Sequence, residues 1–365
     1  MNAPRIPIRV GLVGYGYAGK TFHAPLIAAT DGMALTVVAS SDATRVRQDL
    51  PTVEVVVEPS RLLLHDAVDL VVLATPNASH APLASAALRA GKHVVVDKPF
   101  TLDLAEARQL LQLAHASGRL LSVFHNRRWD SDFLAVRQAI ADGAVGQVTH
   151  FESHIDRYRP TVRARWREQA VPGAGICYDL GPHLIDQALQ LFGLPARIHA
   201  SLAIQRPGGM VDDWAHLLLD YGSTRVVLHA SMLVAGGVAR FTVHGSRGSL
   251  VKLTADRQEA QLLAGMTPGA VGWGEDPDPL TVYDDTGTAR QLPVAAGDYR
   301  HYYRGIGAAL AGRAANPVTP LEALAVMAVL EAALEADRTG RSMALPLTEA
   351  ERISWQQQTG ATAAG

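Results

Sequence analysis

Three side chains that can give or take a proton lie where the surrounding sequence would hold them in place. Lys98 follows an apolar run and stands between Asp97 and Pro99. Asp179 and His183 follow a glycine-rich stretch and are four residues apart. An ammonium group, a carboxylate and an imidazole could together bind a polar substrate and transfer a proton. The sequence therefore indicates acid–base chemistry.

Each of the three has a plainer explanation. A lone lysine is usually solvated, an aspartate near a helix start is often a cap, and a lone buried histidine is often a core residue. Two contexts favour function instead. Pro99 fixes the backbone after Lys98 at a strand end, where open α/β sheets bind ligands. The spacing of Asp179 and His183 places both on one face of a predicted helix.

A glycine fingerprint near the N-terminus indicates a dinucleotide site. The predicted strand 8–13 runs into Gly14-Tyr15-Gly16-Tyr17-Ala18-Gly19, and a helix and a second strand over 35–39 follow. In such a βαβ unit the glycines allow a tight turn, close approach of backbone N–H groups to a pyrophosphate, and close helix packing. A glycine turn that binds nothing is the alternative.

The residues after the second strand bear on which dinucleotide fits. A carboxylate there would bind the ribose and repel a 2′-phosphate, whereas this chain has Ser40 and Ser41, with Arg45 close by. Hydroxyls and a guanidinium suit a phosphate, so NADP is preferred. NAD stays an alternative, because a small shift of the strand end would bring Asp42 to the ribose.

Two further strands complete the predicted cofactor side. The run 68–74 ends in a turn that we expect to close over the cofactor, and the run 93–96 leads to Asp97 and Lys98. Continuous apolar strands of this kind are typical of a parallel sheet covered on both faces. The residues of the first turn that we assign to cofactor binding are Thr75, Pro76, Asn77 and His80.

These motifs resemble the Gfo/Idh/MocA oxidoreductases over nearly the whole chain. The resemblance rests on four runs: Gly14 to Gly19, Ala74 to Asn77, Gly91 to Pro99, and Gly173 to His183. The lysine motif of the family normally begins with glutamate, whereas this chain has Asp97. Longer runs, such as Phe124 to Asp130 and Arg165 to Glu168, are similar to the branch with NADP-dependent scyllo-inositol dehydrogenases.

The resemblance implies hydride transfer between a nicotinamide and a secondary alcohol, most simply scyllo-inositol and its ketone scyllo-inosose. His183 would remove or relay the hydroxyl proton, Lys98 would bind the same oxygen, and Asp179 would orient the substrate or the imidazole. Lys98 could itself be the proton acceptor. Further expected contacts to substrate come from Arg127, Arg128, Tyr158, Arg163, Arg165 and Tyr302, and contacts to cofactor from Asp97, Asn126 and Trp166.

Other functions fit the same residues. The substrate could be myo-inositol, glucose or an anhydro-ketose, because the fold does not encode stereochemistry. A non-catalytic dinucleotide-binding regulator, or a glycosidase or lyase that oxidises its substrate transiently, are alternatives. The arginines between 156 and 167 could equally form a solvated surface loop.

Composition agrees with a two-domain enzyme. The chain has 365 residues, 48% of them hydrophobic, and a net charge of −2, which argues against a nucleic-acid partner. The single cysteine, Cys177, allows no internal disulfide and no cysteine cluster for a metal, and we expect no metal. Residues 1–9 do not form a signal peptide and no long apolar run follows, so we expect a cytoplasmic, membrane-free protein.

The expected fold class is α/β with two parts. Residues 1–125 form a Rossmann domain with a doubly wound parallel sheet. Residues 126–365 form an α+β domain for substrate binding and oligomerisation, with a large, mostly antiparallel, open-faced sheet. The family resemblance implies a homodimer or homotetramer through the open face.

Overall fold

The computed structural model describes residues 7–362 and divides the chain into two compact units. Residues 1–6, part of the segment considered above for a signal peptide, lie outside the described residues. The first unit runs to Trp129 and also takes in Arg257–Gly274 and Asp298–Pro320. The second contains Asp130–Asp256, Glu275–Gly297 and the chain after Leu321. The predicted boundary after residue 125 stays a prediction.

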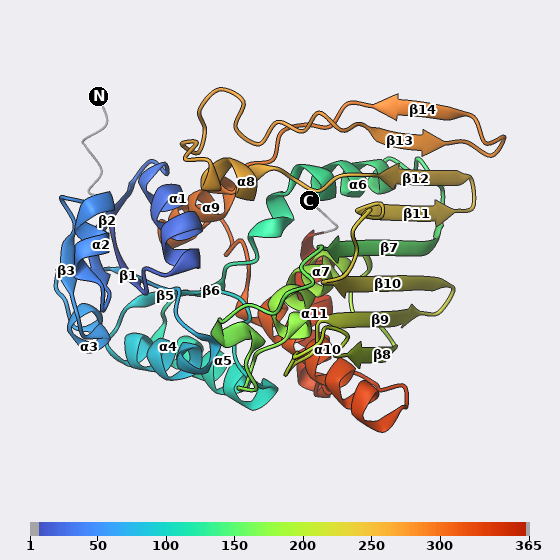
Figure 1. Cartoon of the computed structure of the whole chain (residues 1–365). Helices are drawn as coiled ribbons and strands as arrows, with labels where there is room; N and C mark the ends of the chain where they lie inside the picture. Colours follow the sequence, from blue (N-terminus) through green and yellow to red (C-terminus); the bar gives the residue numbers. More distant parts are fainter. Residues whose placement is uncertain (1–6, 363–365) are drawn as a thin grey trace. The chain divides into compact units, whose positions relative to one another are not determined.

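The first unit is built on a six-stranded parallel sheet in the order β3-β2-β1-β4-β5-β6 (Figure 1). This is the doubly wound order, with helices against both faces, and it confirms the predicted Rossmann fold. The strands are β1 (Ile8–Val13), β2 (Met33–Ala39), β3 (Glu54–Val56), β4 (Leu70–Leu73), β5 (His93–Val96) and β6 (Leu121–Val123). The helices between them are η1 (Gly19–His23), α1 (Ala24–Ala28), α2 (Ala43–Asp49), α3 (Pro59–Leu63), η2 (Asn77–Ser79), α4 (His80–Arg89) and α5 (Leu104–Ser117).

The strand order creates a switch point between β1 and β4, the position at which open α/β sheets bind ligands. Val10 to Val13 pair in parallel with Leu70 to Leu73, so both strands end at the same edge. The glycine fingerprint follows β1 at this edge, and Ala74 and Thr75 follow β4. Both predicted cofactor turns therefore lie side by side.

Late segments of the chain complete the first unit. They contain α8 (Gln258–Leu263) and α9 (Arg300–Leu310), whereas η3 (Asn126–Trp129) ends the first continuous stretch of this unit. Tyr299, Tyr302 and Tyr303 from α9 and the residue before it are fully buried. Ser122 of β6 donates a hydrogen bond to the Val318 carbonyl oxygen (2.9 Å), so the edge strand is covered by its own chain.

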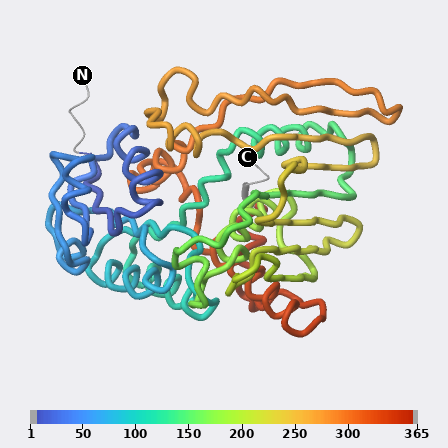
Figure 2. Tube along the Cα trace, viewed as in Figure 1, coloured from blue at the N-terminus to red at the C-terminus, as the bar shows by residue number. Residues whose placement is uncertain are grey.

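The second unit is built on an eight-stranded sheet in the order β14-β13-β12-β11-β7-β10-β9-β8, labelled in Figure 1 and traced as a tube in Figure 2. All neighbours are antiparallel except β7 and β10, which confirms the mostly antiparallel sheet. The strands are β7 (Val148–Asp156), β8 (Arg197–Ala203), β9 (Trp214–Tyr221), β10 (Thr224–Ser231), β11 (Phe241–Gly245), β12 (Gly248–Lys252), β13 (Leu280–Tyr283) and β14 (Ala289–Leu292). Its helices are α6 (Ser131–Ala141), η4 (Trp166–Glu168), α7 (Ile176–Phe192), α10 (Pro320–Thr339) and α11 (Glu349–Thr362).

The two faces of this sheet differ in chemistry. Helix α7 packs on β7, β9 and β10, where Phe151, Leu217 and Leu228 are buried beneath it. Residues at alternate positions point to the opposite face, because side chains alternate along a strand. That opposite face includes His150, His154, His216, His229 and His244, and we name it the histidine face. Whether it packs against a second subunit stays a prediction.

Among the residues that the structure describes, no helix is both long and apolar enough to cross a membrane.

A buried ion-pair cluster ties β12 to the loop that precedes β13. The fully buried Lys252 ammonium lies 3.2 Å from an Asp276 oxygen and also contacts Asp278. We expect Lys252→Met to lower the free energy of unfolding by about 3–5 kcal/mol, because two carboxylates lose their counter-charge in the interior.

The matched control is the exposed pair Arg338 and Glu335, 2.6 Å apart. Arg338→Ala should change stability by less than about 1 kcal/mol, because solvent screens a surface pair. Urea unfolding of both variants measures the difference, and equal midpoints would contradict a stabilising role for Lys252.

Candidate functional site

The glycine fingerprint forms a cradle that side chains would fill. Gly14 has φ +95°, and a Cβ there would lie 2.5 Å from the Ala74 carbonyl oxygen. A Cβ on Gly19 would collide with the Gly14 carbonyl oxygen, whereas none of the described atoms lies within 4 Å of a Cβ on Gly16. Gly14 and Gly19 thus permit the turn, and Gly16 leaves open space above it. This shape fits a pyrophosphate near backbone N–H groups.

The two tyrosines of the fingerprint point away from one another. Tyr15 is buried, and its hydroxyl donates to Asp49 of α2 at 3.3 Å. Burial and the Asp49 charge raise the pKa of Tyr15 to about 12. Tyr17 is half exposed, and its hydroxyl donates to Glu259 of α8 at 2.7 Å. Ala18 precedes the π-helical turn η1.

The residues directly after β2 carry hydroxyl groups, and the first carboxylate, that of Asp42, caps the next helix. β2 ends at Ala39, and Ser40 and Ser41 follow it directly. Asp42 caps α2, because its carboxylate accepts a 3.0 Å hydrogen bond from the Arg45 backbone N–H. The Arg45 side chain is exposed one helical turn away. Asp42 therefore stabilises the start of α2, and the hydroxyl groups of Ser40 and Ser41 lie closer to the end of β2 in the chain.

His80 holds two turns together at the edge of the sheet. Its Nδ1 lies 2.8 Å from the Pro99 carbonyl oxygen, and its Nε2 lies 3.0 Å from the Thr75 carbonyl oxygen. The ring is fully buried, as is nearly all of Asn77. A ring nitrogen that carries a proton donates to the carbonyl oxygen that it faces. His80 thus links the turn after β4 to the turn after β5, which contains Lys98.

Asp97 fixes the backbone at Lys98. The residue is 93% buried, and its carboxylate accepts a 2.8 Å hydrogen bond from the Lys98 backbone N–H. Burial alone would favour the neutral acid, but the neighbouring His23 imidazole and the Lys98 charge hold the pKa of Asp97 at about 2. Lys98 is half-buried. Asp97 therefore lies beneath the predicted cofactor site and positions its lysine.

His23 was not found from the sequence, although it touches this cluster. It is fully buried, with Nδ1 2.6 Å from the Tyr303 hydroxyl and Nε2 3.9 Å from an Asp97 oxygen. The only sequence signal is its position in the helix that follows the fingerprint. Its contact with Tyr303 joins residues 280 positions apart, which no local pattern reveals.

The side chains of the residues after β6 make contacts within the first unit. Arg127 pairs with Glu259 at 2.8 Å, and Arg128 donates to the Pro317 carbonyl oxygen at 3.1 Å. Asn126 is 96% buried. Tyr302 is fully buried and its hydroxyl donates to Ser122 at 2.9 Å. Their predicted roles in binding cofactor or substrate stay predictions.

In the second unit, α7 carries Asp179 in its first turn and His183 one turn later. Asp212, distant in sequence, caps this helix by accepting a 2.7 Å hydrogen bond from the Cys177 backbone N–H. The residue before the helix is Gly175 with φ +94°, and a Cβ there would collide with the Asp212 carboxylate. The glycine therefore lets the carboxylate reach the helix end, which sets where the first turn begins.

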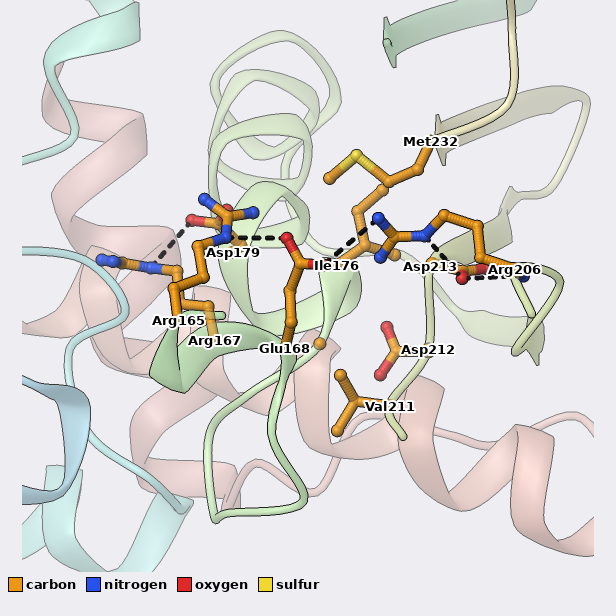
Figure 3. A pocket seen from close by; sticks show the side chains of 11 residues that line it. Arg165, Arg167, Glu168, Ile176, Asp179, Arg206, Val211, Asp212, Asp213 and Met232 are labelled. Carbon is orange, nitrogen blue, oxygen red and sulfur yellow. Dashed lines mark hydrogen bonds and ion pairs between the residues drawn. The ribbon is translucent and has the colours of Figure 1, made fainter. Parts of the chain in front are cut away.

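Asp179 and His183 are both largely buried, on the same face of α7. Asp179 forms an ion pair with Arg167, at 3.4 Å from the guanidinium nitrogen. The Arg167 guanidinium in turn stacks 4.5 Å from the centre of the Trp166 ring. The second unit thus brings Asp179, Trp166 and Arg167 together, as Figure 3 shows for the two charged residues.

The arginine-rich loop is organised around one carboxylate, Glu168 (Figure 3). Glu168 accepts hydrogen bonds from the Arg163 backbone N–H and the Arg165 side chain, both 2.8 Å, and pairs with Arg206 at 3.2 Å. Burial would raise its pKa, but these partners hold the pKa of Glu168 below its usual value. Tyr158 is 59% exposed. The loop is therefore more ordered than a solvated basic segment.

Comparison with known proteins identifies the class to which this fold and site belong. A family model for the NAD-binding Rossmann fold of an oxidoreductase family matches residues 8–125. The model for the C-terminal alpha/beta domain of the same family matches residues 137–345. The chain is thus an NAD(P)-binding oxidoreductase with the two expected parts.

Individual relatives extend over nearly the whole chain. The uncharacterised oxidoreductase YdgJ of Escherichia coli is 52% identical, over 93% of this chain and 99% of its own length. The scyllo-inositol 2-dehydrogenase (NADP⁺) IolW of Bacillus subtilis is 37% identical, over 93% and 96%. A crystal structure from Klebsiella pneumoniae, described only as that of an oxidoreductase, superposes with a TM-score of 0.92 at 54% identity, covering 97% of this chain and 99% of that one. This protein belongs to the Gfo/Idh/MocA oxidoreductase family.

The cap on α7 predicts a distinct pH dependence. Burial, with the Asp213 charge nearby, raises the pKa of Asp212 to about 6, above the value near 3.9 expected for the unfolded chain. The folded protein then binds this proton more tightly, so the free energy of unfolding should fall as pH rises from about 4 to about 6. Asp212→Asn should retain the cap and remove this slope, because an amide oxygen accepts the same hydrogen bond without ionising.

Asp212→Ala is the matched variant without a cap. It should be less stable than Asp212→Asn by about 0.5–2 kcal/mol at every pH, because neither side chain ionises and only the cap differs. Urea unfolding of the three proteins across this pH range measures both effects. An unchanged slope in Asp212→Asn would show that another group titrates.

Proposed function

We propose that this protein is an NADP-dependent dehydrogenase that acts on a secondary alcohol of a cyclic polyol, with scyllo-inositol and scyllo-inosose as the substrate pair. The observation that carries the proposal is the position of Lys98 at the end of β5, held by Asp97 and next to the turns of the glycine cradle. The activity for which the Bacillus subtilis relative is named, scyllo-inositol 2-dehydrogenase with NADP⁺, supports the choice of polyol and cofactor.

The cofactor would be held by the residues of the cradle and its neighbouring turns. The open space at Gly16 suits the pyrophosphate, and the turn from Thr75 to Asn77 lies beside it at the switch point. Ser40, Ser41 and Arg45 would bind the 2′-phosphate, since Asp42 is engaged in capping α2. The bound nicotinamide would accept or supply the hydride.

The protein residues supply the proton chemistry. In this proposal His183 takes the hydroxyl proton, because an imidazole has the pKa best suited to proton transfer near neutrality. Lys98 donates a hydrogen bond to the same oxygen and stabilises the negative charge that develops there. Asp179, held by Arg167, orients the substrate hydroxyl or the imidazole. Arg163, Tyr158 and Tyr302 keep their predicted roles around the polyol.

The test of the function is nicotinamide absorbance with the purified protein. NADP and NAD are offered separately with scyllo-inositol, myo-inositol and a set of aldoses, and scyllo-inosose is offered with the reduced cofactors. Turnover selective for NADP and the scyllo-inositol pair is the expected result. Cofactor binding without turnover of any polyol would contradict the proposal and leave the family assignment intact.

The catalytic assignments predict a loss of turnover without loss of cofactor binding. Lys98→Met and His183→Asn should each lower kcat by about 10²–10⁴-fold, the usual contribution of acid–base catalysis. Binding of reduced NADP, followed by its fluorescence, should change little. His115→Asn, at an exposed histidine of α5, is the control and should keep full activity. Near-native turnover of either catalytic variant would exclude its role.

The phosphate assignment predicts a change of cofactor preference. Ser40→Asp should raise the KM for NADP by tenfold or more, because the new carboxylate repels the 2′-phosphate and suits the ribose of NAD. Arg45→Ala should weaken NADP binding by about 10–100-fold, the value of a hydrogen bond to a charged group, and leave NAD binding unchanged. Steady-state kinetics with both cofactors measure the shift. Equal effects on both cofactors would place the 2′-phosphate elsewhere.

A further inference from the structure

The histidine face carries a cluster that the proposed oxidoreductase chemistry does not use. Along β7 the polar residues His150, Glu152, His154 and Asp156 alternate with Phe151 and the other residues of the helix-covered face. This alternation places the four polar side chains in one row on the face opposite α7. The second unit thus presents imidazoles and carboxylates on the side away from its catalytic candidates.

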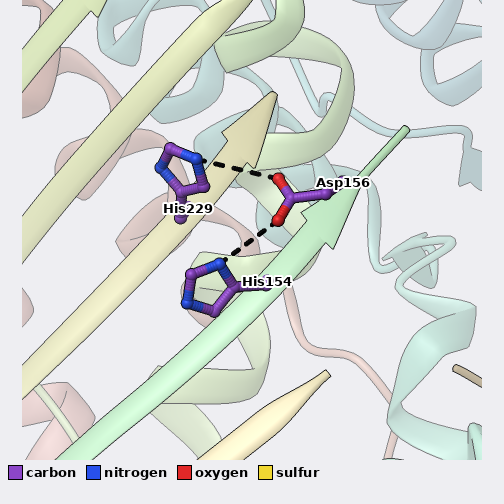
Figure 4. Close-up of side chains that lie close together, drawn as sticks. All are labelled: His154, Asp156 and His229. Atoms are coloured by element: carbon purple, nitrogen blue, oxygen red, sulfur yellow. Dashed lines mark hydrogen bonds and ion pairs between the residues drawn. The ribbon is translucent and has the colours of Figure 1, made fainter. Parts of the chain in front are cut away.

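Strand register brings histidines from neighbouring strands to the same point. His154 of β7 pairs with His229 of β10, and His229 pairs with His216 of β9. Asp156 lies two residues beyond His154 on the same face. Its carboxylate oxygens lie 3.3 Å from His154 Nδ1 and 3.8 Å from His229 Nε2 (Figure 4). One donor atom from each of these three residues lies within 4.8 Å of the others.

Asp156 has an oxygen that the fold leaves without a hydrogen bond. Its side chain is 94% buried, and Oδ1 has no hydrogen-bond partner among the described residues. The nearest imidazole nitrogen, His229 Nε2 at 3.8 Å, is beyond hydrogen-bond distance. A buried carboxylate oxygen without a partner is costly, so its position calls for a positive ligand.

The far nitrogens of both imidazoles have partners that would orient them. His154 Nε2 lies 3.3 Å from a Glu152 oxygen, which leaves Nδ1 directed at Asp156. His229 Nδ1 lies 3.4 Å from His216 Nδ1, which leaves Nε2 directed at Asp156. Histidines that bind metals usually bond through the other ring nitrogen to a carboxylate or similar group, which fixes the ring.

We propose that His154, Asp156 and His229 form a binding site for one divalent transition-metal ion of the zinc class. Two imidazoles and a carboxylate are the donor set that Zn²⁺ and Co²⁺ accept in four-coordinate sites, with water in the fourth position. Donors around such an ion lie about 3.3 Å apart, so small side-chain rotations would close the present spacing. The ion would join the adjacent strands β7 and β10 and neutralise Asp156.

The experiment is a titration of the metal-free full-length protein with Co²⁺, followed by visible absorbance, and with Zn²⁺ in competition. We expect one ion per chain and the intense bands of a four-coordinate site. Asp156→Asn and His229→Gln should each abolish the bands. Glu152→Gln should weaken binding by about 10–100-fold, the usual effect of losing a group that orients a ligand.

The matched control is His244→Gln. His244 lies on the same face, but its ring bonds to Ser249 at 2.7 Å and takes no part in the cluster. This variant should bind Co²⁺ like the wild type. Identical binding by wild type and Asp156→Asn, or a spectrum unchanged from aqueous Co²⁺, would overturn the proposal.

Thermal unfolding gives a second readout that does not depend on activity. Zn²⁺ in excess should raise the Tm of the wild type and of His244→Gln, because an ion that binds only the folded state stabilises it. It should leave Asp156→Asn and His229→Gln unchanged. A rise of the same size in all four proteins would show that Zn²⁺ acts elsewhere and would also overturn the proposal.

Discussion

The ionised, buried carboxylate of Asp97 is the constraint on which the first unit's site depends. It ends β5, accepts the backbone N–H of Lys98, and faces the buried His23 imidazole. A charge at this depth is tolerated only with partners, so the carboxylate fixes the residues around it. The short aspartate side chain accepts the backbone N–H of the very next residue. His80 then ties that turn to Thr75, so the lysine and the glycine cradle share one rigid edge.

In the second unit, too, carboxylates that accept hydrogen bonds position the candidate catalytic side chains, but here they act at the start of a helix. Asp212 caps α7 from outside. Glu168 binds two arginines of the loop that precedes the helix, Arg163 and Arg165, and also Arg206, which follows β8. Asp179 receives its orientation from that loop through Arg167. In both units a buried carboxylate accepts hydrogen bonds from backbone N–H groups, and this fixes the positions of the functional side chains nearby.

The sequence predicts those features of the fold that depend on a local pattern of residues. The parallel strands appear as continuous apolar runs, and the three glycines have the three steric roles that the fingerprint implies. The edge strands β3 and β14 are short and at least partly exposed throughout, so no run of buried apolar residues marks them in the sequence. Contacts between distant residues were equally hidden: Asp212 reaches Cys177 across 35 positions, and Tyr303 reaches His23 across 280. Helix α9 had a signal, since Tyr299, Tyr302, Tyr303 and Ile306 recur at helical spacing.

The two faces of the second sheet also show that contacts between distant residues are hidden in the sequence. The alternation of His150, Glu152, His154 and Asp156 with apolar or small residues is visible in the sequence and marks one polar face. The sequence does not show that His229 and His216 join that row, because this depends on a parallel pairing of β10 with β7 across about 75 residues of chain. The strand register brings histidines from separate strands into one cluster, so the histidine face depends on the topology of the sheet. In the same way, the order of the strands in the first sheet places Lys98 near the glycine cradle.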